Sequence, residues 1–85
     1  MRLTYTVVFT PGEKGGYVAD VPALPGCATY GQTLTEALMM VEEAIMGYIE
    51  MLQADGDRIP RERGGVLVSL GRSREAFVRK VTVSR

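Results

Sequence analysis

One long amphipathic helix is the feature of the sequence that most limits the fold. Between residues 34 and 52, apolar side chains recur at spacings of three and four, which places them on one helical face. They are Leu34, Ala37, Leu38, Val41, Ala44, Ile45, Tyr48, Ile49 and Leu52. Thr33 and Glu36 have the spacing of a capping box before this run, and Gly56 is a typical stop after it. The pattern predicts a helix of about 21 residues that packs on an apolar surface.

Strand-like segments lie on both sides of this helix. Alternation of apolar and polar residues predicts strands at residues 3–10, 17–21, 27–30 and 77–83. The short connection at 11–16 is rich in glycine and predicts an antiparallel hairpin. Residues 66–70 form either a further strand or an extended loop. The order β-β-β-α-β predicts an α+β fold, an antiparallel sheet with one long helix packed on one face, in a single domain over residues 1–85.

The segment ADVPALPGCATYGQTLTEAL, residues 19–38, resembles an active-site loop because it holds the only cysteine of the chain. Its other residues have structural explanations. Pro25 and Gly26 suit the two central positions of a type II turn, and Gly31 is expected to allow a bend before the helix. Without histidine in the chain, Cys27 lacks the usual activating base, so we expect a buried thiol and not a nucleophile.

Length and composition set the class of protein. A chain of 85 residues buries a modest fraction of its surface, so we expect a homo-oligomer, a dimer or a tetramer, formed through an unpaired sheet edge. The sequence has no signal-peptide pattern and no apolar run long enough to span a bilayer. With a single cysteine as well, these features predict a cytoplasmic protein without membrane contact.

Charge is balanced in total but uneven along the chain. Residues up to Asp57 include eight acidic and two basic side chains, and residues from Arg58 onward include eight basic and two acidic ones. The two halves either neutralise each other in the fold or provide a charged surface for a partner. The candidate partner-binding residues are Arg58, Arg61, Arg63, Arg72 and Arg74.

The order of turn, cysteine and helix-capping residues resembles the HicB family, the antitoxin half of HicA–HicB toxin–antitoxin pairs. The motif residues are Pro22, Pro25, Gly26, Cys27, Gly31, Thr33 and Glu36. They lie within residues 3–60, and residues 66–84 form the C-terminal strand region. The resemblance implies a partial ribonuclease-H-like domain that binds and neutralises a HicA-type toxin, a small mRNA-cleaving protein.

Many members of this family carry a C-terminal DNA-binding module. After Pro60 the chain has 25 residues with a strand-like pattern, which are too few for such a module. Direct DNA binding is therefore not expected. The resemblance predicts a non-enzymatic antitoxin or a binding module derived from one, with no metal and no cofactor.

A divergent metal-dependent nuclease of ribonuclease-H-like fold is the alternative. It would need two or three carboxylates converging on divalent ions, and Asp20 and Glu36 are the nearest to the loop. Glu36 already has a capping role, so Asp20 is the residue on which this alternative depends.

Overall fold

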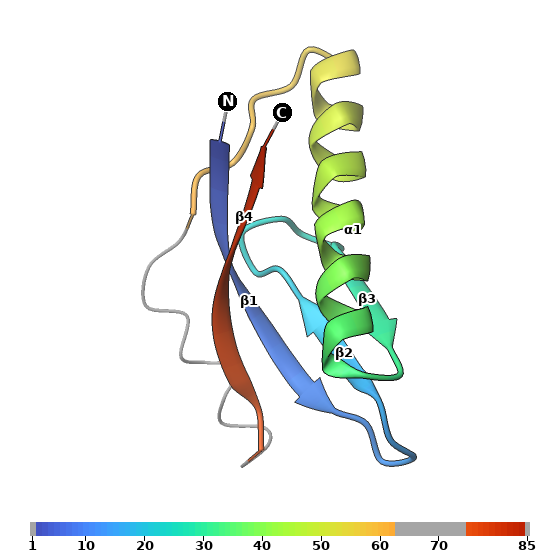
Figure 1. The fold of residues 1–85 in the computed structure, drawn as a ribbon. Coiled ribbons are helices and arrows are strands. Elements are labelled where there is room, and N and C mark those ends of the chain that lie inside the picture. Colours follow the sequence, from blue (N-terminus) through green and yellow to red (C-terminus); the bar gives the residue numbers. More distant parts are fainter. Residues whose placement is uncertain (1, 63–74, 85) are drawn as a thin grey trace.

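The computed structural model describes residues 2–62 and 75–84, which form a four-stranded antiparallel sheet with one helix across it (Figure 1). The elements are β1 (Arg2–Pro11), β2 (Tyr17–Asp20), β3 (Ala28–Gly31), α1 (Leu34–Ala54) and β4 (Phe77–Ser84). The strand order is β3-β2-β1-β4. The predicted α+β fold with the element order β-β-β-α-β is confirmed. The possible strand at 66–70 lies outside the described residues.

The strand β1 lies inside the sheet and pairs with β2 on one side and with the C-terminal strand β4 on the other. It pairs with β2 over four residue pairs, from Val8↔Asp20 to Pro11↔Tyr17. It pairs with β4 over eight, from Arg2↔Ser84 to Phe9↔Phe77. The β1–β4 ladder is therefore the longer of its two pairings.

The core lies between one face of this sheet and α1. Val7 and Phe9 of β1 are fully buried, as are Val41, Ile45 and Ile49 of the helix. Complete burial of an apolar side chain of this size contributes about 1.5–3 kcal/mol. The alternation of β1 and the helical spacing of α1 therefore direct their apolar residues into one shared layer.

The helix α1 begins directly after the N-cap residue and ends just before the glycine that the sequence predicts. The Glu36 amide donates to Oγ1 of Thr33 over 3.0 Å, which satisfies one unpaired donor of the first turn. At the other end Gly56 has φ +73°, and the amides of Gly56 and Asp57 donate to the carbonyls of Gln53 and Leu52. This is the Schellman arrangement of a helix C-terminus.

Gly31 has a different role from the bend expected of it. Its φ lies outside the left-handed region, so backbone freedom does not explain the residue. A Cβ atom at this position would lie 2.3 Å from the backbone nitrogen of Ala37. Gly31 is needed because the end of β3 passes directly against the first turn of α1.

Candidate partner-binding surface

The loop that resembled an active site is a buried structural connection between β2 and β3. The Val21 amide donates to the Cys27 carbonyl over 3.0 Å, which closes the loop at its base. β2 ends one residue before its expected end, and β3 begins and ends one residue after its expected bounds. Gly26 has φ +82°, and the Cys27 amide donates to the Leu24 carbonyl over 2.9 Å, as the predicted turn requires. Leu24 is fully buried in the core. The loop therefore closes one end of the core.

A hydrogen bond from the helix α1 also fixes this loop. The Tyr48 hydroxyl donates to the Pro25 carbonyl over 2.9 Å. Cys27 is 5% exposed, and burial together with the Asp20 charge raises the pKa of its thiol. A raised pKa keeps the thiol protonated and a poor nucleophile near neutral pH.

The two carboxylates considered for a metal site do not come together. Asp20 is exposed on β2 beside core residue Ala19, so its side chain points away from the helix-covered face. Glu36 is exposed in the first turn of α1, which lies on the opposite face. Among residues 2–62 and 75–84, no three His, Cys, Asp or Glu side chains form a group that could hold a metal ion.

Two of the five candidate arginines lie in the described segment that follows α1. Arg58 and Arg61 are both exposed. The segment is fastened to the sheet by the Tyr5 hydroxyl, which donates to the Pro60 carbonyl over 2.7 Å. The other three candidates, Arg63, Arg72 and Arg74, lie outside the described residues.

A polar cluster that sequence reasoning missed fixes the end of this segment. Lys80 Nζ of β4 donates to Thr6 Oγ1 over 2.9 Å and to Glu62 Oε2 over 3.0 Å, and the Thr6 hydroxyl also donates to Glu62. Burial acts to raise the pKa of Glu62, but these hydrogen bonds and the Lys80 charge outweigh it and leave that pKa lowered. The three residues are far apart in sequence, so no local pattern marks them.

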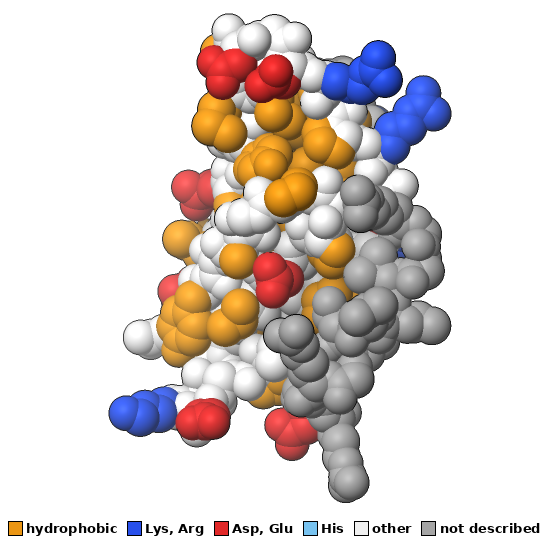
Figure 2. Space-filling view, turned by 180° about the vertical axis from the view of Figure 1, so that it is seen from behind, with side chains coloured by type: hydrophobic (Ala, Val, Ile, Leu, Met, Phe, Trp, Pro, Cys, Tyr) orange, Lys and Arg blue, Asp and Glu red, His pale blue; other side chains and the backbone are white. Residues whose placement is uncertain are grey.

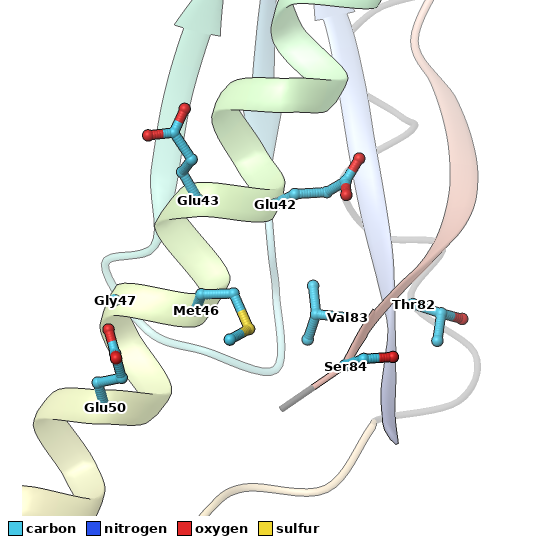
Figure 3. A pocket seen from close by; sticks show the side chains of 8 residues that line it. All are labelled: Glu42, Glu43, Met46, Gly47, Glu50, Thr82, Val83 and Ser84. Carbon is cyan, nitrogen blue, oxygen red and sulfur yellow. The ribbon is translucent and has the colours of Figure 1, made fainter. Parts of the chain in front are cut away.

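A second feature is an open groove of about 620 Å³ between α1 and the end of β4. It is lined by Glu42, Glu43, Met46, Gly47, Glu50, Thr82, Val83 and Ser84. Met46 and Val83 point toward one another across its floor, and Glu42 points from the helix toward the strand (Figure 3). Three acidic residues of the helix, Glu42, Glu43 and Glu50, therefore line this groove.

The opposite face of the sheet is partly apolar. Val18, Tyr30 and Val78 are 38%, 48% and 45% exposed, and Val18 and Tyr30 are cross-strand partners. Figure 2, the view from behind, shows hydrophobic side chains in the upper half of the molecule and a separate group at the lower left. The helix in the described part of the chain does not combine the length and apolar character that crossing a bilayer requires.

The same sheet-and-helix arrangement occurs in solved antitoxin structures. One structure is described as a toxin–antitoxin complex from Streptococcus pneumoniae. It superposes with a TM-score of 0.81 at 19% identity, over 99% of this chain and 70% of that one. The N-terminal domain of antitoxin HicB from Burkholderia pseudomallei superposes with a TM-score of 0.80 at 25% identity, over 98% of this chain and all of that one. The fold is thus that of a HicB-type antitoxin domain.

Sequence comparison gives the family. Residues 5–76 match the family described as HicB_like antitoxin of bacterial toxin–antitoxin system. A UPF0150 protein from Thermoplasma acidophilum is 52% identical over 60 residues, which cover 71% of this chain and 87% of the relative. Antitoxin HicB 1 of Photorhabdus laumondii is 36% identical over 59 residues, which cover 69% of this chain and 38% of that antitoxin. The chain belongs to the HicB-like antitoxin family.

Proposed function

We propose that this chain is a non-enzymatic antitoxin that binds a HicA-type, mRNA-cleaving toxin and neutralises it. The observation that carries the proposal is the family match over residues 5–76, together with a fold that the antitoxin domains share. Structures described as toxin–antitoxin complexes, including one of HicA3 and HicB3, are among its fold relatives.

Several features support a binding role over a catalytic one. The cysteine loop is a closed part of the core, and Asp20 and Glu36 lie on opposite sides of the sheet. Nothing in the described residues favours the alternative of a metal-dependent nuclease that uses Asp20. In this proposal the chain is a single domain whose ribonuclease-H-like architecture serves binding.

The partner determines the other parts of the proposal. A toxin that cleaves mRNA acts in the cytoplasm, so its antitoxin works there as well. Arg58 and Arg61 are both exposed and would pair with acidic groups on the toxin. Arg63, Arg72 and Arg74, which lie outside the described residues, are further candidates for contact with the toxin. The antitoxin works as a homo-oligomer, without direct DNA binding by residues 1–85.

Co-expression with the toxin encoded beside it tests this function. The chain is expected to restore growth of cells that express the toxin and to copurify with the toxin on an affinity tag. The double variant Arg58→Glu, Arg61→Glu is expected to weaken copurification at least tenfold, because like charges at an interface oppose association.

Lys14→Glu is the matched control, since Lys14 is exposed in the turn between β1 and β2, away from residues 58–61. It should leave toxin binding unchanged. A toxin that neither binds the chain nor loses activity in its presence would refute the proposal. Cleavage of RNA by the purified chain with Mg²⁺ or Mn²⁺, abolished by Asp20→Asn, would establish the nuclease alternative instead.

A further inference from the structure

The outer edge of β4 is the longest unpaired strand edge in the described part of the chain. β4 has eight residues, and within residues 2–62 and 75–84 it pairs only with β1. The opposite edge strand, β3, has four residues. Every second residue of an edge strand directs its backbone N–H and C=O groups outward, where they can pair with another strand.

We propose that β4 pairs antiparallel with β4 of a second copy of this chain, about a two-fold axis at Val81. The partner's Arg79 would then enter the groove between α1 and β4, where Glu42 and Glu43 lie. By symmetry, Arg79 of this chain enters the partner's groove. The result is one continuous eight-stranded sheet with both helices on the same face.

Charge and side-chain alternation are compatible with this register and disfavour two neighbouring ones. Opposite residues of two antiparallel strands share a face, so a symmetric pairing must be centred on a residue. A centre at Arg79 or Lys80 would place two like charges directly opposite each other, which is unfavourable. A centre at Val81 pairs Arg79 with Val83, and Lys80 with Thr82, and uses residues 78–84 of both strands.

The groove supplies an acidic environment for the partner's Arg79. Val81 and Val83 are buried in the core, so Arg79 stands on the same face of β4 and is exposed there. Val83 lines the groove, and Glu42 points toward β4 (Figure 3). A residue opposite Val83 on that face therefore lies on the side of α1 toward which Glu42 points, whereas Glu43, also a lining residue, points away from β4 (Figure 3).

The arginine also makes this edge selective. A charged side chain on the core-side face of an edge strand discourages pairing with most other strands, because its charge would be left without a partner. Only a strand that brings acidic groups to the same place accommodates it. A second copy does so twice, and the two-fold symmetry closes the assembly at a dimer instead of an open filament.

This inference goes beyond toxin neutralisation and does not depend on it. Its first test is the molar mass in solution by light scattering after gel filtration. The wild-type chain is expected at twice the 9.3 kDa of one chain. Arg79→Glu should shift it to the monomer mass, as should the double variant Glu42→Arg, Glu43→Arg.

A mixture of these two variants gives the sharper result. Each variant alone repels itself, whereas in the mixed pair both contacts join opposite charges. Equimolar mixing is expected to restore the dimer mass, and Lys14→Glu, an exposed charge change elsewhere, should remain dimeric. A monomeric wild-type chain, or a dimer that Arg79→Glu leaves intact, would overturn the proposal.

Cysteine crosslinking tests the register directly. In a Cys27→Ala background, Val81→Cys should form an intermolecular disulfide under mild oxidation, because residue 81 of each copy faces its counterpart. Val83→Cys faces Arg79 and should remain uncrosslinked, with circular dichroism showing that both variants are folded. Crosslinking at residue 83 but not at 81 would contradict the Val81 axis.

Discussion

At the scale of single residues, Gly31 shows that one absent methyl group can fix how a helix sits on a sheet. The site for a Cβ at Gly31 is filled by the backbone of Glu36 and Ala37. Backbone atoms cannot swing aside as a flexible side chain can. The close approach of β3 to α1 therefore depends on this position being glycine.

Gly31→Ala is accordingly expected to destabilise the fold by about 3 kcal/mol, the upper part of the usual range for overpacking. Gly47→Ala is the matched control, because a Cβ at Gly47 would meet nothing within 4 Å and the residue lies in the middle of α1. This control should gain about 0.5–1 kcal/mol from helix propensity. Urea unfolding of the two variants measures both changes in the free energy of unfolding. A Gly31→Ala variant as stable as the wild type would contradict the close packing of β3 on α1.

At the scale of elements, the segment after α1 is held by side chains from two strands. Thr6 of β1 and Lys80 of β4 are directly opposite in the sheet and meet Glu62 together. Tyr5 holds Pro60 two residues earlier. These contacts give residues 58–62 a fixed path along the sheet, which sets where Arg58 and Arg61 are presented.

Glu62→Gln is expected to lower stability by about 1 kcal/mol at pH 7, a modest value because Lys80 is largely exposed. The pKa of Glu62 is lower in the folded chain than its ordinary value of 4.5, so this stabilisation is present above pH 4.5. It is lost as the pH falls through the folded-state pKa. Thermal unfolding from pH 7 to pH 3 should show the wild-type and variant curves converging at the acid end.

Glu13→Gln, in the exposed turn between β1 and β2, is the control and should follow the wild type throughout. A constant difference between wild type and Glu62→Gln at every pH would contradict the role of the Glu62 charge.

The elements themselves could be predicted from sequence because their signals are local. The spacing of apolar residues and the caps located α1, and the alternation of β1 and β4 located the strands to within a residue. The role of Gly31 and the Thr6–Glu62–Lys80 cluster could not be predicted, because each depends on segments that meet only in the folded chain. The groove between Glu42 and Val83 has the same origin.

At the scale of the whole molecule, the outer edge of β4 is unpaired within residues 2–62 and 75–84, and Glu42 of the helix points toward this strand (Figure 3). Both features lie at β4, so the proposed self-association would be coupled to the stability of the fold. A dimer that binds only folded chains stabilises them by mass action.

The melting temperature should therefore rise by a few degrees when the chain concentration increases from about 1 to about 100 μM. Arg79→Glu should melt at one temperature over the same range. Differential scanning calorimetry at several concentrations provides the measurement. A wild-type melting temperature independent of concentration would oppose a dimer linked to folding.

The pairing of β1 with β4 also has a consequence for the order of folding. The ladder between β1 and β4 joins residues 2–9 to residues 77–84, so it cannot form until both segments are present. The β1–β2 hairpin, in contrast, needs only a short loop to close. During synthesis, β1 therefore stays half-paired until residues 77–84 have left the ribosome. The nascent chain has neither the groove nor the β4 edge before that moment, so these two features arise together, late in folding.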